Sequence, residues 1–139
     1  MIILDTSVLY ALLDRRDRRH DEAALWYSQT DEEMATTPLI VAEVDHLART
    51  RTGRRAVEAF HRDLAGGAYL VEWWPGAAAR IVEVAGHYSG LDLGLADASL
   101  IALAERLGTT ALATFDERHF RAVRPLTGGL AFALAPTDS

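Results

Sequence analysis

The sequence predicts an α/β sandwich with a mostly parallel central sheet of about five short strands flanked by helices. Short apolar runs such as Ile2-Ile3-Leu4 have the length and β-branched content of buried strands. Helical stretches alternate with these runs, a pattern typical of a parallel sheet. A chain of 139 residues without a visible repeat or linker fits one domain. We expect a single domain over residues 1–134 and a short, frayed tail at 135–139.

The first half of the chain is predicted to hold two strands and four helices. Asp5, Thr6 and Ser7 follow the first apolar run and are favoured N-cap residues, so the strand should end at Asp5 and a helix should follow. Thr37-Pro38 is a second helix-start signal, with Thr as the N-cap and Pro in the first turn. The predicted strands are 2–4 and 34–36, and the predicted helices are 8–13, 20–29, 38–51 and 55–65.

The second half continues the alternation. A strand is predicted at 69–73, and Pro75 opens a helix that reaches Tyr88. The next helix belongs to the stretch 91–108, where Gly108 occupies the C′ position that favours glycine. The remaining predicted elements are a strand at 110–115, a turn or short helix at 117–120 and a candidate fifth strand at 123–126.

Composition narrows the function classes. Cysteine is absent, which excludes disulfides and thiolate metal sites, and no apolar run reaches the roughly 18 residues of a membrane span. We see no signal peptide and expect a cytoplasmic protein without membrane contact. The net charge of −6 argues against a nucleic-acid partner. However, every basic residue is Arg, the better bidentate phosphate ligand, so net charge does not decide the question.

One carboxylate, Asp97, is predicted to be buried. It lies in a stretch that is apolar on every side, and helices of that kind are buried. A lone ionised carboxylate is costly to bury, and this helix carries no Lys or Arg before Arg106. Asp97 therefore requires a paired base, backbone N–H donors or a metal ion from elsewhere in the chain.

Three other acids are placed to meet Asp97. Asp5 and Asp116 follow predicted parallel strands, whose carboxyl ends share one edge of the sheet, and Glu43 falls on the apolar stripe of the helix 38–51. An oxygen-rich cluster suits Mg²⁺ or Mn²⁺ and phosphodiester hydrolysis. Each acid also has a structural interpretation: Asp5 and Asp116 as N-caps, and Glu43 at the edge of its stripe in contact with water. Asp97 is the hardest to explain structurally.

Four motifs, LDTSVLYALLD, TTPLIVAEVDHL, LGLADASLIALAERLG and LATFDERHF, occur in this order and span almost the whole chain. Together they resemble the PIN domain, specifically the VapC toxins of type II toxin–antitoxin modules. The resemblance implies a PIN-domain sandwich in which Asp5, Asp97 and Asp116 are Mg²⁺ (or Mn²⁺) ligands and Glu43 joins them as the fourth catalytic acid. It also implies that Thr6, Ser7 and Thr114 hold the carboxylates or a metal-bound water.

The resemblance further implies a metal-dependent ribonuclease whose products carry a 5′-phosphate and a 3′-hydroxyl. Its substrate would be an RNA, with a tRNA or ribosomal RNA loop as the expected target, and cleavage would inhibit translation. A cognate VapB-type antitoxin would neutralise the toxin, and a homodimer and a toxin–antitoxin hetero-oligomer are expected.

Three alternatives stay open. A non-catalytic PIN-type module that binds RNA or protein is disfavoured by the intact acid set. A phosphotransfer fold shares the strand–Asp–helix opening, but Ser7 stands where a haloacid-type phosphatase needs its second Asp, and no Lys is present. A metal-dependent DNA nuclease is the third alternative, because the sequence carries no signal for the sugar.

Two arginine clusters are candidate phosphate contacts. Acids interleave the cluster at 15–19, so the second cluster is the preferred RNA contact beside the acidic residues, although solvated charged turns explain both. His119 is the one histidine near a candidate acid, Asp116; the histidines otherwise show no metal-ligand spacing. The arginines of the preferred cluster are Arg49, Arg51, Arg54 and Arg55.

Overall fold

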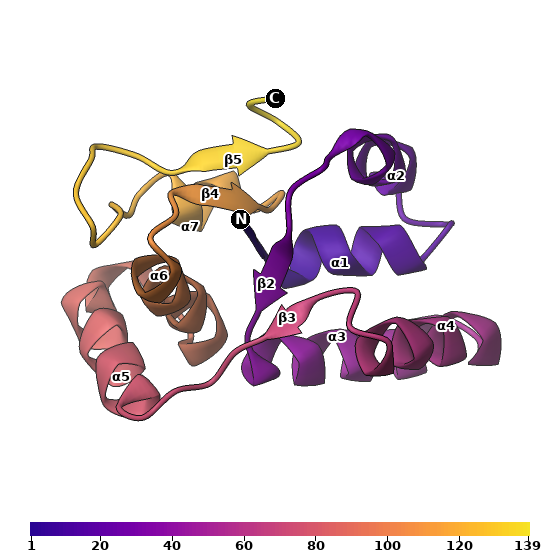
Figure 1. Ribbon diagram of the computed structural model, residues 1–139, viewed down its shortest axis with the longest axis horizontal. Helices are drawn as coiled ribbons and strands as arrows, with labels where there is room; N and C mark the ends of the chain where they lie inside the picture. The colour runs from indigo at the N-terminus through magenta and orange to yellow at the C-terminus, as the bar shows by residue number, and fades with distance from the viewer.

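The computed structural model describes residues 1–139 and contains a five-stranded, fully parallel sheet (Figure 1). The strand order is β3-β2-β1-β4-β5, so β1 lies at the centre. The predicted α/β sandwich is therefore confirmed. The strands are β1 (Ile2–Leu4), β2 (Met34–Thr36), β3 (Leu70–Val71), β4 (Ala111–Ala113) and β5 (Ala133–Ala135).

Helices connect the strands and flank the sheet. Helix α1 packs against α2 and α3, whereas α5 packs against α6, and these two groups lie on opposite sides of the view in Figure 1. None of the helices combines the length and the apolar character that crossing a membrane requires. The helices are α1 (Thr6–Leu13), α2 (His20–Gln29), α3 (Pro38–Arg51), α4 (Arg54–Ala65), α5 (Ala77–His87), α6 (Leu95–Leu107) and α7 (Glu117–Phe120), with a 3₁₀ turn η1 (Ser89–Leu91).

The core centres on β1 and β4. Ile3, Leu4 and Leu112 are fully buried within a cluster of 29 buried apolar residues. A central parallel strand is covered on both faces, which explains why it reads as a continuous apolar run. Because β1 and β4 pair in parallel, the residues that follow them, Asp5 and Thr114, are brought to the same edge of the sheet.

The predicted start of α3 is confirmed. Thr37 is its N-cap and accepts a hydrogen bond from the N–H of Ile40, and Pro38 occupies the first turn. The Thr37 hydroxyl also hydrogen bonds to Ser99 Oγ at 2.8 Å. This contact joins the beginning of α3 to the first turns of α6.

The prediction of a fifth strand at 123–126 was wrong. The fifth strand is Ala133–Ala135, which pairs with β4 in the register Leu112–Leu134. Val123 is buried, but it reaches the core from a loop without a strand partner. An apolar run shows that a segment is buried, whereas a strand also needs a neighbour for its backbone hydrogen bonds.

Two further expectations were wrong. The end of the chain is not frayed, because the Asp138 carboxylate accepts hydrogen bonds from Arg121 Nη2 at 2.7 Å and from the N–H of Leu134 at 2.8 Å. The stretch 91–108 is not helical throughout: Asp92 has a left-handed φ of 53°, and α6 begins only at Leu95.

Candidate functional site

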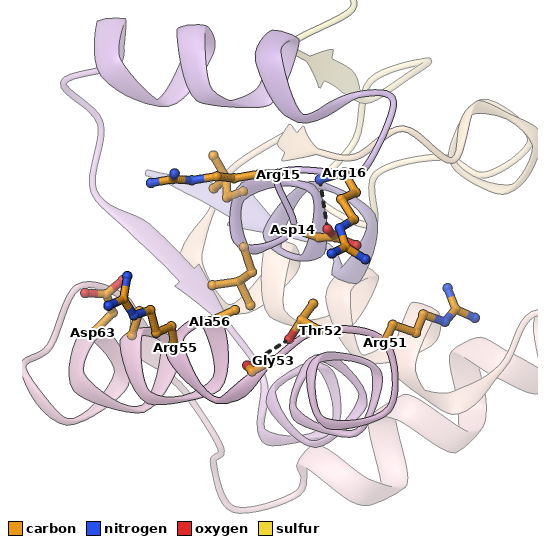
Figure 2. Close-up of a pocket in the computed structure, with 12 residues that line it drawn as sticks. Asp14, Arg15, Arg16, Arg51, Thr52, Gly53, Arg55, Ala56 and Asp63 are labelled. Carbon is orange, nitrogen blue, oxygen red and sulfur yellow. Dashed lines mark hydrogen bonds between the residues drawn. The ribbon is translucent and has the colours of Figure 1, made fainter.

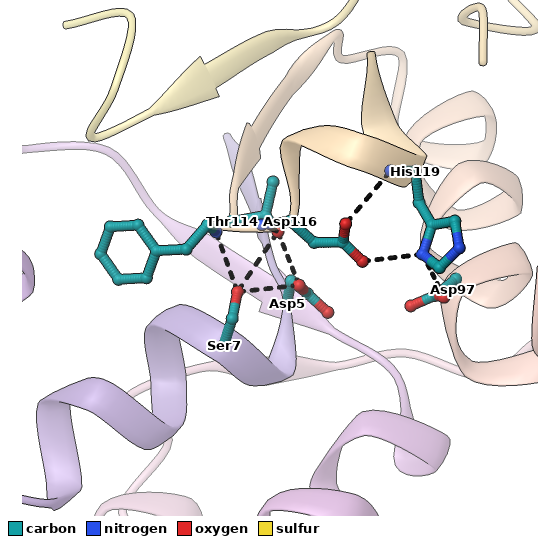
Figure 3. Close-up of polar contacts among 7 residues, drawn as sticks. Asp5, Ser7, Asp97, Thr114, Asp116 and His119 are labelled. Atoms are coloured by element: carbon teal, nitrogen blue, oxygen red, sulfur yellow. Dashed lines mark hydrogen bonds and ion pairs between the residues drawn. The ribbon is translucent and has the colours of Figure 1, made fainter. Parts of the chain in front are cut away.

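Asp5 lies at the carboxyl end of β1 with only 5% of its surface exposed. Its Oδ2 accepts hydrogen bonds from Thr114 Oγ1 at 2.6 Å and from Ser7 Oγ at 3.0 Å (Figure 3). Asp5 occupies the N-cap position of α1, yet its side chain makes no capping hydrogen bond. The N-cap interpretation therefore does not account for this carboxylate.

The two hydroxyl groups that hold Asp5 also organise the loop after β4. Ser7 Oγ accepts a hydrogen bond from the N–H of Phe115 at 2.9 Å, and Thr114 Oγ1 accepts one from the N–H of Asp116 at 2.9 Å. Both hydroxyls thus link α1 and β1 to β4. The third candidate hydroxyl, Thr6 Oγ1, is buried and has no hydrogen-bond partner.

Asp97, Asp116 and His119 form a compact cluster beside Asp5. One ligand atom from each of the three lies within 4.8 Å of the others. His119 Nδ1 lies 2.8 Å from Asp116 Oδ2 and 3.7 Å from Asp97 Oδ2 (Figure 3). We call Asp5, Asp97, Asp116 and His119 the acidic site.

The two carboxylate oxygens of Asp116 have different partners. Its Oδ1 accepts a hydrogen bond from the N–H of His119 at 3.1 Å and caps α7, so its structural interpretation is confirmed. Its Oδ2 contacts the His119 ring. The capping bond therefore orients the carboxylate toward Asp97 without consuming both of its oxygens.

Negative charge is concentrated in the acidic site. Burial, followed by the charges of Asp5 and Asp116, raises the pKa of Asp97 to about 6. Burial also raises the pKa of Asp5, although hydrogen bonds from Thr114 and Ser7 oppose that shift. The hydrogen bond to Asp116 raises the pKa of His119. The raised pKa values of Asp5 and Asp97 are those expected of carboxylates that lack a full counter-charge, whereas that of His119 reflects a cation stabilised by neighbouring carboxylates.

Asp97 reaches this position differently from the prediction. Asp97 was expected to be buried in an all-apolar helix, but it lies in the first turn of α6 and its side chain remains 24% exposed. The N-terminal end of a helix carries partial positive charge, which favours a carboxylate there. Asp97 is thus a half-buried acid at a helix start, where the helix end favours its charge while burial and the neighbouring acids oppose it.

Glu43 lies at the edge of the acidic site. Its side chain is exposed, and the buried residues of α3 are Ile40, Val44 and Ala48, so the interpretation that Glu43 meets water at the edge of its stripe is confirmed. Its charge raises the pKa of Asp97 less than the charges of Asp5 and Asp116 do. Glu43 therefore adds negative charge at the solvent side of the site without a hydrogen bond to the other acids.

His119 is absent from the predicted metal ligands, yet the structure places it beside Asp97 and Asp116. The useful signal was its spacing from Asp116, because an N-cap residue and the residue three positions later face one another across the first turn. Neither residue is informative alone. His119 reaches the acidic site because only three residues separate the end of β4 from the start of α7.

The preferred arginine cluster does not adjoin the acidic site. Arg51 ends α3 eight residues after Glu43, which is about 12 Å along a helix. Arg49 pairs with Asp45 at 3.1 Å, and Arg54 lies 3.7 Å from Glu58. Arg51 and Arg55 instead line a groove at the junction of α3 and α4 (Figure 2).

The donor set of the acidic site fits a divalent cation. Two carboxylates and one imidazole converge, with the buried Asp5 beside them. Carboxylates are preferred ligands of Mg²⁺ and Mn²⁺. An imidazole is a more usual ligand of later transition metals such as Zn²⁺. A bound cation would offset the repulsion that raises the pKa of Asp97.

Comparisons with known proteins agree with this geometry. The family model of the PIN domain matches residues 2–125. Ribonuclease VapC26 of Mycobacterium tuberculosis is 38% identical over 132 residues, which cover 92% of this chain and 96% of that protein.

Two solved structures share the fold. The M. tuberculosis toxin VapC20, described as cleaving the sarcin-ricin loop, superposes with a TM-score of 0.82 at 22% identity, over 92% of this chain and 98% of its own. FitAcB from Neisseria gonorrhoeae gives a TM-score of 0.58 at 24% identity, over 84% of this chain and 88% of its own. At these identities the likeness concerns the fold alone.

Proposed function

The chain belongs to the PIN domain family, and on that premise we propose that it is a metal-dependent ribonuclease toxin of the VapC type. The observation that carries the proposal is the convergence of Asp97, Asp116 and His119 beside the buried Asp5. A relative of 38% identity that is named a ribonuclease supports the same activity.

In this proposal Asp5, Asp97 and Asp116 hold Mg²⁺ or Mn²⁺. When bound, the cation supplies charge stabilisation at the phosphodiester and lowers the pKa of the attacking water. The chain's own residues supply geometry: Thr114 and Ser7 fix one oxygen of Asp5, and the capping bond of α7 orients Asp116. His119 restrains the second oxygen of Asp116, as partners of ligating carboxylates commonly do.

Glu43 has a separate role in the proposal. Its exposed side chain adds a negative charge at the solvent side of the site. This charge raises the pKa of Asp97, although the two side chains form no hydrogen bond. That position suits the attraction of a cation toward the site. Thr6, with its unpartnered buried hydroxyl, is the remaining donor at the start of α1.

We extend the proposal to the partners of a VapC-type toxin. These are an RNA loop as substrate, with cleavage that stops translation, a VapB-type antitoxin and a second copy of the chain. The name of the 38% identical relative supports the toxin class, and the description of VapC20 makes a ribosomal RNA loop the first substrate to test. A non-catalytic PIN-type binding module is the alternative.

The first experiment is induction of the wild type, Asp5→Asn and Asp97→Asn in growing cells, with sequencing of new RNA 5′ ends. We expect growth arrest with discrete cuts from the wild type and neither from the variants, because each variant removes one carboxylate of the acidic site. Equal arrest by all three proteins would identify the binding module instead. A folded wild-type protein that causes no arrest and no cuts would overturn the ribonuclease proposal.

A further inference from the structure

A second charged feature lies away from the acidic site. A groove of about 810 Å³ opens between the end of α1, the junction of α3 and α4, and the first turns of α4 (Figure 2). Four arginines line it, and we call it the arginine groove. They are Arg15, Arg16, Arg51 and Arg55.

None of the four guanidinium groups of the arginine groove forms a direct ion pair with a carboxylate. The ion pairs of the molecule involve other arginines, namely Arg19, Arg49, Arg54, Arg80 and Arg121. Four unpaired cations in one groove are unusual for a chain of net charge −6. Their mutual repulsion is relieved when an anion enters.

The acidic residues of the groove offset these cations only in part. Two carboxylates, Asp14 and Asp63, face four guanidinium groups. The Asp14 carboxylate is already engaged, because it accepts hydrogen bonds from the Tyr10 hydroxyl at 2.6 Å and from the N–H of Arg16 at 2.9 Å. The lining therefore keeps a positive surplus.

The backbone at the edge of the groove adds to this surplus. Gly53 is the N-cap of α4 and has no side chain to accept a hydrogen bond from the first turn. The first N–H groups of a helix carry partial positive charge, which favours a nearby anion. The guanidinium of Arg51 is meanwhile held 5.9 Å from the centre of the Tyr10 ring.

The lining favours a phosphate backbone over an acidic peptide. A helical peptide would need an apolar anchor, yet the large exposed apolar side chains of the molecule all lie outside this groove. Leu12 and Leu13 line it, but they pack against the core. Planar guanidinium groups match phosphate oxygens in pairs, so four of them in one groove favour a phosphate backbone.

We propose that the arginine groove binds the sugar–phosphate backbone of the RNA substrate at a distance from the acidic site. The inference rests on the proposed ribonuclease function. Helix α1 spans the two features, since Asp5 precedes its first residue and Leu13 ends it, about 12 Å further on. An RNA strand that follows α1 would reach both. Groove contacts of this kind position a substrate without reading its sequence.

The test is the binding of a fluorescein-labelled, single-stranded RNA of mixed sequence, measured by anisotropy in EDTA so that no cleavage occurs. The double variant Arg51→Gln/Arg55→Gln should bind about tenfold more weakly, and its salt slope should fall by about 1.4, or roughly 0.7 for each lost phosphate contact. The control Arg62→Gln/Arg124→Gln removes the same charge from exposed arginines outside the groove and should bind as the wild type does.

A second pair of variants keeps the test independent of folding. Gly53 has a φ of −99° and open space where a Cβ would stand, so Gly53→Asp and Gly53→Ser both supply an N-cap. Only Gly53→Asp adds negative charge to the groove. We expect it to bind the labelled RNA several-fold more weakly than Gly53→Ser does.

The outcomes separate this inference from the proposed function. If the wild type cleaves RNA while Arg51→Gln/Arg55→Gln binds it with unchanged affinity and salt slope, the groove proposal is overturned and the ribonuclease stands. Competition by poly-glutamate as effective as by unlabelled RNA would overturn it in favour of an acidic peptide. If the wild type neither binds nor cleaves RNA, both proposals fail together.

Discussion

At the scale of single residues, the acidic site is organised around Asp97. Burial and the carboxylates of Asp5 and Asp116 raise its pKa to about 6, while the nearby His119 opposes the shift. Hydroxyl groups hold Asp5 in place, but no hydrogen bond to a neutral donor holds Asp97. The metal-free protein therefore keeps an under-compensated carboxylate, which is the arrangement that a cation-binding site requires.

The repulsion around ionised Asp97 predicts that Asp97→Asn changes the free energy of unfolding of the metal-free protein in a pH-dependent way. A carboxyl group whose pKa is higher in the folded state binds more protons when folded, so its ionisation above about pH 4 lowers the free energy of unfolding. Asn mimics the protonated form. Relative to the wild type, Asp97→Asn should gain stability as the pH rises from about 4 to about 7, as measured by urea unfolding in EDTA.

Asp31→Asn is the matched control for this experiment. Asp31 is exposed and lies outside the acidic site, so Asp31→Asn removes the same charge without changing the repulsion around Asp97. A stability difference between Asp97→Asn and the wild type that does not grow with pH would contradict the electrostatic account of the acidic site.

At the scale of elements, the site depends on how helices begin. Helix α1 follows Asp5, α6 carries Asp97 in its first turn, and α7 is capped by Asp116. Helices α3 and α6, which carry Glu43 and Asp97, are joined by the buried hydrogen bond between Thr37 Oγ1 and Ser99 Oγ. Three helix starts and one inter-helix bond thus position the four candidate acids.

Ser99→Ala tests the bond between these helices. Both hydroxyls are fully buried, and removing one leaves the other without its partner at a cost of about 1–3 kcal/mol in the free energy of unfolding. The loss should appear in urea unfolding together with weaker Mn²⁺ binding, because α6 is no longer tied to the start of α3. Ser28→Ala, on the exposed face of α2, should change neither quantity. Unchanged stability in Ser99→Ala would show that the bond contributes nothing to the placement of α6.

At the scale of the whole molecule, charge is sorted along α1. The acidic site lies at its beginning, and the arginine groove lies at its end. Such sorting allows a chain of net charge −6 to present a cation site and an anion-binding surface at the same time. Net charge alone would have argued against nucleic acid.

Metal binding should therefore be visible in global stability. A ligand that binds only the folded state raises the free energy of unfolding by about 2.7 kcal/mol at a free concentration of 100 Kd. The protein is first stripped of metal with EDTA, the EDTA is removed, and Mn²⁺ is then added in steps. We expect the Tm, measured by calorimetry, to rise with the Mn²⁺ concentration. Asp97→Asn should lose this increase, whereas Asp31→Asn should keep it. An equal increase in wild type and Asp97→Asn would place the ion elsewhere.

Local signals in the sequence were sufficient for much of the fold. The apolar run before Asp5, the Thr37-Pro38 helix start and the Gly108 helix end each describe interactions within a few residues, and the structure contains all three. The α/β class follows from their alternation. The placement of Asp5 and Asp116 at one edge of the sheet likewise needs only the rule that parallel strands end together.

By itself, the sequence determined that a strand ends at Asp5 and that a helix starts at Thr37-Pro38. Capping and apolar periodicity act over short distances, so a local pattern is sufficient for both. Only the tertiary structure decided which segment became β5, that α6 begins at Leu95, that His119 faces Asp97, and that Arg51 and Arg55 share a groove with arginines from the end of α1. Strand pairing and side-chain convergence join residues far apart in the chain. No local pattern records which distant partner a backbone group or a charge will meet.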